Sequence, residues 1–506
     1  MKLFKVKTPF IILLSIILVQ LSCNSHKKEQ PAEKEKFIQK QNKRPNVIMI
    51  SVDDLNGWLG CMDGHPNALT PNMDKLAASG TLFTNAHAQA PLCGPSRSSI
   101  MTGLRPSTTG IYGHIEDDDI KKNNETTKNI SFLPEYFKEH GYYTMGIGKI
   151  FHKHAPDGVF DESGGRSPGF GPKPEKEFVW DGKPFKKGGE RRTSTDWGAF
   201  PEHDSLMPDV ASTNWAIERL NKDYEKPFFM AVGYLRPHVP WYVPQKWFDM
   251  HPLENIKTPP YKSDDWDDIP NIVNQIDELT MMPTTEWAIK TGEWPKIVQA
   301  YLASVTFVDH YIGELLKGLK NSKYADNTIV VLWSDHGYRI GEKGTFAKHC
   351  LWDEGTGSVL MFSGPGIASH IVTNEPAELL SLYPTLTELC DLPKNKRNEG
   401  VSLVPILKKE PNASLDYALT THGFKNHSIR TKQYRYTQYI DGSEELYDLY
   451  EDPNEFINLV NTEESKDVKD RLKAYMPKEN QPWTKYSEYT FNNYFIQDKI
   501  KHSENQ

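Results

Sequence analysis

Cysteine is scarce in this chain, and positive charge is not in excess. The formal net charge of −8 excludes the basic balance that proteins binding nucleic acid non-specifically need. An anionic substrate would therefore have to be bound by local basic groups. No internal repeat is visible, which argues against a solenoid or a propeller. The 506 residues contain five cysteines, none in a CxxC pair of the kind that binds zinc: Cys23, Cys61, Cys93, Cys350 and Cys390.

Long hydrophobic runs are absent except near the start of the chain. Three lysines precede a short apolar stretch that ends at Cys23, a pattern typical of an export signal rather than of a membrane-spanning helix. The pattern predicts a lipoprotein signal peptide at 1–23 and an exported protein anchored through a lipid on Cys23, at the periplasmic face or the cell surface. A cleaved signal without lipid and an uncleaved anchor are the alternatives. Residues 24–44 are polar and mixed in charge, which indicates a flexible tether.

Buried strands alternate with helices over most of the remaining sequence. The run NVIMISVDD at 46–54 is a continuous apolar strand that ends in two carboxylates. Further strands are expected at 142–148, 228–234 and 328–335, and a helix with apolar residues at helical spacing at about 301–320. This alternation predicts an α/β fold in which helices flank a central sheet on both faces.

The composition and the periodicity of the sequence change in two places. Residues 155–208 are rich in Gly, Pro, Lys and Trp without periodicity, which indicates an irregular insertion that is either functional or mobile. After about Val404, aromatic and polar residues alternate around an Asp441-Gly442 turn, which is a hairpin pattern. We therefore expect a large domain at 45–404 and a smaller α+β domain with an antiparallel sheet at 405–500.

Acidic residues stand at the ends of two predicted strands. Asp53 and Asp54 end one strand, and Asp335 and His336 end another. Ligand sites in open α/β sheets lie at that edge, and carboxylates favour a hard cation such as Ca²⁺ or Mg²⁺. His336 is a less usual Ca²⁺ ligand, so the chemistry alone leaves the metal open. Each pair taken singly is equally consistent with a solvated strand end.

The segment from Cys93 to Arg97, CGPSR, opens a motif that continues SSIMTGLRP. It matches C-x-P-S-R-x-x-x-x-T-G, the signature of type I sulfatases. The blocks SVDD, GIGKIFH, PFFMAVGYLRPHVP and SDHGYRIGEKGTFAKH stand in the order of the iduronate-2-sulfatase-like branch, which the chain resembles from about 46 to 458. The resemblance implies an alkaline-phosphatase-like large domain with a mixed, mostly parallel sheet. It also implies that a maturation enzyme converts Cys93 to formylglycine, whose hydrate is the nucleophile. An unmodified buried or redox-active thiol is the alternative.

A cation site and a supporting arginine are implied by the same resemblance. Arg97 would hold the hydroxylate of the formylglycine and the metal carboxylates, a position that suits a permanently charged fork. The cation would lower the pKa of the hydrate and neutralise sulfate charge. The side chains that would bind one Ca²⁺ are Asp53, Asp54, Asp335, His336 and the modified Cys93.

Four basic residues complete the implied site. Lys149 would bind a sulfate oxygen or the hydrate, and His152 would take the proton that triggers release of sulfate. His238 would protonate the leaving sugar oxygen, and Lys348 would bind the sulfate from the other side. Without the resemblance, each of these residues could equally be an ordinary surface or turn residue.

The resemblance leaves the sugar open. His349 stands where the iduronate enzyme carries an aromatic residue near its sugar. We expect a sulfated oligo- or polysaccharide, either an algal polymer such as ulvan or a uronate-containing glycosaminoglycan. Besides this substrate, the maturation enzyme is the expected partner. We expect membrane contact only through the lipid anchor, and no nucleic acid. The alternatives are a phosphatase or phosphonate monoester hydrolase of the same fold, and a sulfated-glycan-binding lipoprotein without turnover.

Overall fold

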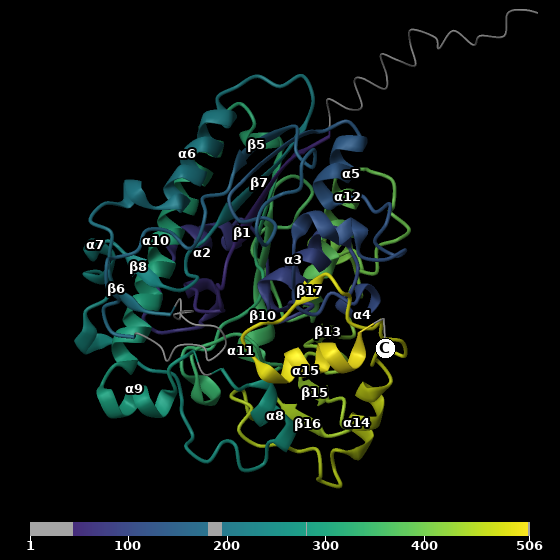
Figure 1. Ribbon diagram of the computed structural model, residues 1–506. Coiled ribbons are helices and arrows are strands. Elements are labelled where there is room, and N and C mark those ends of the chain that lie inside the picture. Colours follow the sequence, from purple (N-terminus) through teal and green to yellow (C-terminus); the bar gives the residue numbers. More distant parts are fainter. Residues whose placement is uncertain (1–43, 181–194, 280, 504–506) are drawn as a thin grey trace, which may run out of the picture. The chain divides into compact units, whose positions relative to one another are not determined.

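The structure is a computed structural model that describes residues 44–180, 195–279 and 281–503 (Figure 1). The predicted signal peptide and tether lie outside the described residues, apart from Arg44. From Arg44 onward the chain forms one compact unit, and a domain boundary near residue 404 stays a prediction. In the part of the chain that the structure describes, no helix is both long and apolar enough to cross a membrane.

A nine-stranded sheet lies at the centre of this unit. The strand order is β11-β2-β10-β9-β1-β7-β4-β5, and β12 also pairs with β2. Only β10 is antiparallel to its neighbours, while the other pairs are parallel. The predicted mixed, mostly parallel sheet is therefore confirmed. The strands are β1 (Asn46–Val52), β2 (Gly80–His87), β4 (Tyr143–Ile147), β5 (Glu162–Gly165), β7 (Phe228–Tyr234), β9 (Thr328–Ser334), β10 (Gly357–Ser363), β11 (Ile371–Thr373) and β12 (Ala377–Glu378).

Helices cover both faces of the sheet, as predicted (Figure 1). These helices include α2 (Pro71–Ala78), α3 (Cys93–Thr102), α5 (Leu133–Glu139), α6 (Pro208–Leu220), α10 (Trp294–Lys320) and α12 (Leu382–Leu389). Helix α10 packs against α2 and α6, and α3 packs against α5 and α12. The helix expected at about 301–320 begins earlier, at Trp294, because a proline at 295 is tolerated in a first helical turn.

Shorter elements fill the connections between these helices and strands. The insertion predicted at 155–208 contains β5 and β6, and its residues 181–194 lie outside the described residues. Strand β6 pairs with β8 in a small parallel sheet. The short elements are β6 (Trp197–Ala199), β8 (Trp241–Val243), α4 (Pro106–Thr109), α7 (Gln245–Phe248), α8 (Asn271–Ile276), α9 (Thr285–Thr291), α11 (Asp353–Thr356) and α13 (Val404–Leu407).

Strand β1 shows why the central strands read as continuous apolar runs. All seven of its residues are buried. Ile48 and Ile50 join the hydrophobic cluster on the α10 face, whereas Val47 and Met49 join the cluster on the α3 face. Successive side chains of a strand point to opposite faces, so a strand covered on both sides needs apolar residues throughout.

The C-terminal part forms a second, antiparallel sheet. Its four strands run in the order β13-β14-β15-β16, and the predicted hairpin at Asp441-Gly442 joins β15 to β16, with Gly442 at a positive φ of 87°. Farther along, β17 pairs with the short strand β3. The elements are β3 (His114–Ile115), β13 (Ala418–Thr421), β14 (His427–Arg430), β15 (Tyr434–Gln438), β16 (Glu444–Asp448), α14 (Lys466–Lys473), β17 (Ser487–Glu488) and α15 (Asn493–His502).

Candidate active site

Parallel strands bring the predicted site residues to one edge of the central sheet. Strands β9, β1, β7 and β4 are neighbours in that order and run parallel. Their carboxyl ends therefore meet at the same edge, where ligands bind in open α/β sheets. The predicted residues that follow them are Asp335 and His336 after β9, Asp53 and Asp54 after β1, His238 after β7, and Lys149 and His152 after β4.

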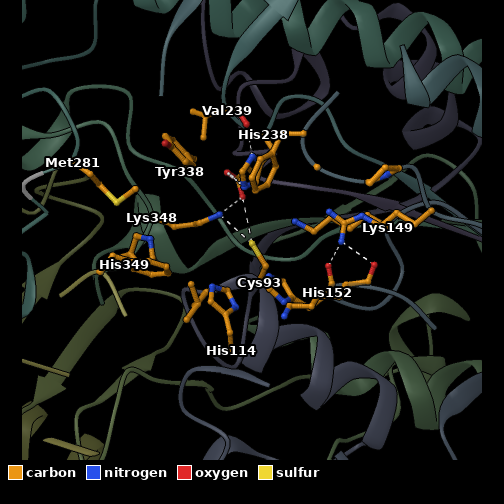
Figure 2. A pocket seen from close by; sticks show the side chains of 18 of the residues that line it. Cys93, His114, Lys149, His152, His238, Val239, Met281, Tyr338, Lys348 and His349 are labelled. Carbon is orange, nitrogen blue, oxygen red and sulfur yellow. Dashed lines mark hydrogen bonds and ion pairs between the residues drawn. The ribbon is translucent and has the colours of Figure 1, made fainter. Parts of the chain in front are cut away.

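Cys93 is the first residue of α3, a helix whose ten residues are all buried. Its Sγ lies 3.0 Å from Lys348 Nζ, 3.3 Å from His336 Nε2 and 3.8 Å from Asp54 Oδ1. Figure 2 shows this sulfur between Lys348 and Lys149, which approach from opposite sides. A helix N-terminus carries partial positive charge, so the position favours a nucleophile that becomes anionic.

Arg97, one turn farther along α3, is 1% exposed and fixes several surrounding groups. Its Nε donates to Asp335 Oδ2 at 2.8 Å, and its Nη2 donates to Asp53 Oδ1 at 3.3 Å. Its Nη1 donates to Ser51 Oγ at 2.8 Å and to the carbonyl oxygen of Lys149 at 2.5 Å. The planar guanidinium thus holds two carboxylates and two strand ends in fixed positions.

The carboxylates and their neighbours fit a bound divalent cation. Asp54 adopts a left-handed backbone with φ 59°, and its buried Oδ2 has no hydrogen-bond partner among the described residues. A buried acceptor without a partner is costly, and a cation would satisfy it. Hard oxygen ligands of this kind suit Ca²⁺. Candidate ligand atoms within 4.8 Å of one another form two groups that share the cysteine: Asp53, Asp54, Cys93 and His238, and Cys93, Asp335 and His336.

Basic side chains pair with these carboxylates. Lys149 Nζ donates to Asp53 Oδ2, and Lys348 Nζ donates to Asp54 Oδ1 at 2.6 Å. Together with Arg97, three basic side chains therefore face three carboxylates. A divalent cation added to this set would leave positive charge in excess, which favours an anionic ester in the site.

Burial shifts the pKa values of the central groups. It raises the pKa of the Cys93 thiol to about 12, although Lys149 and Lys348 act in the opposite direction. Burial also raises the pKa of Asp54, and Lys348 offsets this only in part. For Asp53 burial acts in the same sense, but Lys149 and the other nearby cations outweigh it and hold its pKa well below the usual range.

His238 is neutral in the free protein. Burial lowers its pKa well below 6.5, and Lys348 lowers it further. Its Nδ1 lies 2.6 Å from the carbonyl oxygen of Val239, which accepts the ring proton, so Nε2 is unprotonated and lies 3.8 Å from Asp54 Oδ2. The ring stacks on Phe170 with centroids 4.5 Å apart. To protonate a leaving group, this histidine must first gain a proton on Nε2.

His152 stacks on a second histidine. The ring centroids of His152 and His114 lie 4.0 Å apart with an interplanar angle of 10°. Burial lowers the pKa of His152 well below 6.5, and His114 lowers it further, so the His152 ring is neutral near pH 7. Its backbone N–H donates to Asp117 Oδ1 at 3.2 Å. Sequence reasoning missed His114, because a two-residue strand carries no recognisable pattern.

The site opens into a cavity of about 510 Å³. Arg166, from the irregular insertion, lines it and donates through Nη1 to the carbonyl oxygens of His152 and Lys153. Within the described ranges Arg166 has no acidic partner, so its charge is available to a ligand. Sequence reasoning did not predict these lining residues: His114, Arg166, Phe170, Met281, Met282, Tyr338 and Phe491.

Comparison with known families identifies the chain. Residues 45–392 match the family model described as Sulfatase, and residues 341–482 match N-sulphoglucosamine sulphohydrolase, C-terminal. Together with the site, the first match defines a hydrolase of sulfuric esters. The chain belongs to the sulfatase family, which confirms the type I sulfatase prediction.

Relatives of known name support this membership. A protein named sulfatase from Formosa agariphila is 55% identical over 499 residues, covering 98% of this chain and 97% of that protein. The iduronate 2-sulfatase of Mus musculus is 33% identical over 398 residues, covering 69% of each chain. The ulvan-active sulfatase of Formosa agariphila is 28% identical over 495 residues, covering 92% of this chain and 86% of that protein.

Solved structures confirm the alkaline-phosphatase-like fold. A structure in complex with its substrate D-glucosamine-2-N,6-O-disulfate has a TM-score of 0.67 and 22% identity, covering 85% of this chain and 96% of that chain. The phosphonate monoester hydrolase of Agrobacterium radiobacter has a TM-score of 0.66 and 20% identity, covering 85% and 94%. The two scores are nearly equal, so the fold alone does not separate sulfate from phosphonate chemistry.

Proposed function

We propose that this protein hydrolyses sulfate esters of an acidic, sulfated carbohydrate and releases inorganic sulfate through a formylglycine made from Cys93. The observation that carries the proposal is the position of Cys93. It lies at the N-terminus of α3 and lines the cavity, between Lys348 and His336 and beside Asp54. A buried thiol that served only packing would have apolar neighbours instead.

The raised pKa of Cys93 explains why a conversion would be needed. With a pKa of about 12, the thiol is protonated near neutral pH, and the thiolate is the reactive form. In the proposed route, one hydroxyl of the aldehyde hydrate gives up its proton to solvent, and its oxygen attacks sulfur while the bond from sulfur to the sugar oxygen breaks and that oxygen takes a proton from His238. The second hydroxyl then loses its proton and the C=O bond re-forms. At the same time the bond between the formylglycine carbon and the sulfate oxygen breaks, which releases sulfate. Water adds to the aldehyde and restores the hydrate.

The surrounding residues take separate roles in this route. Lys149 and Lys348 bind sulfate oxygens from opposite sides, and Arg97 holds the carboxylates in place. His152, neutral with an unpaired Nδ1, accepts the proton of the second hydroxyl. His238 donates the proton to the leaving sugar oxygen once the negative charge of the bound sulfate has raised its pKa.

One Ca²⁺ is the cation that the oxygen-rich ligand set favours. Asp53, Asp54, Asp335 and His336 would hold it together with the modified Cys93. When bound, it would lower the pKa of the hydrate and neutralise charge on the ester as a Lewis acid. The unpartnered buried oxygen of Asp54 supports this proposal.

A uronate-containing polysaccharide is the substrate class that the cavity favours. The two lysines would bind the sulfate, whereas Arg166, which has no acidic partner among the described residues, suits a second negative group such as a sugar carboxylate. The names of two relatives, iduronate 2-sulfatase and ulvan-active sulfatase, point in the same direction, and we place ulvan first. We further propose export as a lipoprotein anchored through Cys23, and maturation by an oxidising enzyme that acts on Cys93 while the chain is unfolded.

Sulfate release from a panel of substrates tests the proposal. The protein, produced with a formylglycine-generating enzyme, is incubated with ulvan oligosaccharides, 2-O-sulfated hexuronate disaccharides, an aryl sulfate and an aryl phosphate. We expect free sulfate from a uronate-containing substrate. Preferred cleavage of the aryl phosphate would support a phosphatase or phosphonate hydrolase. Binding of the oligosaccharides without sulfate release, together with an intact thiol at Cys93, would support a glycan-binding lipoprotein.

A further inference from the structure

The last segment of the chain forms part of the cavity wall. Strand β17 pairs with β3, with Glu488 opposite His114, and this pairing carries the residues that follow to the cavity. Phe491 lines the cavity, and its ring lies edge-on to His114 and His349 at centroid distances of 5.6 and 5.7 Å. The two family matches end at residues 392 and 482, so neither covers this segment.

Behind this wall, three buried side chains form a hydrogen-bonded row. The hydroxyl of Tyr489 contacts Nδ1 of His349 and lies 3.4 Å from Nε2 of His422. Each of the three residues is at most 4% exposed. Burial lowers the pKa of His349 well below 6.5 and that of His422 to about 3. Both rings are therefore neutral near pH 7, and each carries one ring proton.

The hydrogen-bond partners of each ring nitrogen determine where these protons lie. A tyrosine hydroxyl that lies between two neutral imidazoles donates to one and accepts from the other. Nδ1 of His422 is buried and has no hydrogen-bond partner in the part of the chain that the structure describes. If Tyr489 donated to His422, this Nδ1 would carry a buried N–H without an acceptor, and orphan donors are rarer than unfilled acceptors. Tyr489 therefore donates to Nδ1 of His349, which places the ring proton of His349 on Nε2.

The Nε2 of His349 is the open end of this row. His349 lines the cavity next to Lys348 (Figure 2), and no described residue forms a hydrogen bond with its Nε2. Its backbone is left-handed with φ 65°, a conformation that histidine adopts more readily than most residues. Its backbone N–H donates to the carbonyl oxygen of Pro91 at 3.2 Å. The ring therefore presents one N–H donor at a fixed position in the cavity.

Building on the proposed function, we propose that His349 is a specificity-determining residue whose Nε2–H donates to an acceptor oxygen of the sugar. Tyr489 is a positioning residue that keeps the proton on Nε2, and Phe491 provides an apolar face on which the sugar ring packs. Lys348 and Cys93 lie on the sulfate side of the cavity. This wall therefore discriminates among sugars and leaves cleavage of the ester bond itself unchanged.

Four variants test this assignment. His349→Asn tolerates the left-handed backbone but loses the Nε2 donor, and Tyr489→Phe removes the hydroxyl that orients the proton. His154→Asn, at an exposed histidine, and Tyr494→Phe, at a tyrosine on α15 outside this cavity, are the matched controls. For each variant, kcat and KM are measured with the best oligosaccharide of the panel and with 4-nitrophenyl sulfate.

We expect a change in kinetics that is confined to the sugar substrate. His349→Asn should lower kcat/KM for the oligosaccharide about 3- to 10-fold, mainly through KM, since one hydrogen bond is lost. Tyr489→Phe should change it in the same direction by a smaller factor, and 4-nitrophenyl sulfate turnover and both controls should stay unchanged. Equal losses with both substrates, or no loss in either test variant, would overturn the assignment.

Binding measurements separate this inference from the proposed function. In a Cys93→Ala background, calorimetry compares the affinity for the same oligosaccharide with and without His349→Asn. Affinity should fall by a factor similar to that of kcat/KM. An unchanged affinity would contradict the role of His349, whereas the absence of sulfate release by unmutated, matured protein would contradict the proposed function alone.

Discussion

Substitution of Arg97 by lysine should destabilise the protein more than a conservative exchange usually does. The guanidinium donates to Asp335, Asp53, the hydroxyl of Ser51, and the carbonyl oxygens of Lys149 and Ile150. A lysine ammonium has only three donors on a flexible stem. The carbonyl oxygen of Lys149 keeps the hydroxyl of Ser51 as a donor, so three donors would face the four remaining acceptors, and at least one of these buried acceptors would lose its partner.

The size of the loss follows from this count. A buried acceptor left without a partner costs about 1–3 kcal/mol, so one such acceptor predicts a decrease of at least about 1–3 kcal/mol in the free energy of unfolding. Whole domains are stable by only about 5–15 kcal/mol, so the change is large enough to measure. Guanidinium-induced unfolding, followed by tryptophan fluorescence, gives the difference between Arg97→Lys and the unmutated protein.

A matched exchange at the surface provides the control. Arg219 donates through Nε and Nη2 to Oε1 of Glu162 at 3.0 and 2.7 Å, but this pair is partly exposed, at 13% and 26%. Exposed ion pairs contribute about 0–1 kcal/mol, so Arg219→Lys should have little effect. If Arg97→Lys cost no more than Arg219→Lys, the argument that Arg97 holds the site together would be refuted.

Four further predictions concern the chemistry. Cys93→Ala should abolish sulfate release while the free energy of unfolding stays within about 1 kcal/mol of that of the unmutated protein, and retained activity would reject the mechanism. Dialysis against a chelator should lower the rate and Ca²⁺ should restore it, whereas an indifferent enzyme would reject the ligands assigned here. Arg166→Gln should raise KM for a uronate substrate about 10- to 100-fold and leave an aryl sulfate unaffected, because a charge-assisted hydrogen bond is lost. In protein made without the maturation enzyme, alkylation of Cys93 should be slow at pH 8, and its rate should rise about tenfold per pH unit. The reason is that only the thiolate reacts, and the thiolate fraction grows up to the pKa of about 12. Rapid labelling at pH 7 would contradict the raised pKa.

The site residues that follow the central strands could be predicted from the sequence, because strand periodicity is a local signal. Apolar runs that stop at Asp53 and Asp335 indicate buried parallel strands, and parallel strands end at one edge. The antiparallel partner of β9, strand β10, and its neighbour β2 were not predicted. Strand β2 includes the polar residues Thr84 and Asn85, so its sequence lacks the apolar run that marks a central strand.

The far wall of the cavity could not be predicted, because tertiary contacts alone create it. Arg166 belongs to an insertion without periodicity, and its placement depends on the carbonyl oxygens of His152 and Lys153. Phe491 lies nearly 400 residues beyond Cys93 in the sequence and reaches the cavity only through the pairing of β17 with β3. The roles of the individual site residues stay predictions that the experiments above address.

The most direct test of the central claim is the mass of the peptide that contains Cys93, measured in protein that releases sulfate. We expect this peptide to carry an aldehyde in place of the thiol, and the converted fraction to rise in proportion to specific activity. Full activity in a sample whose Cys93 is entirely an unmodified thiol would contradict this claim.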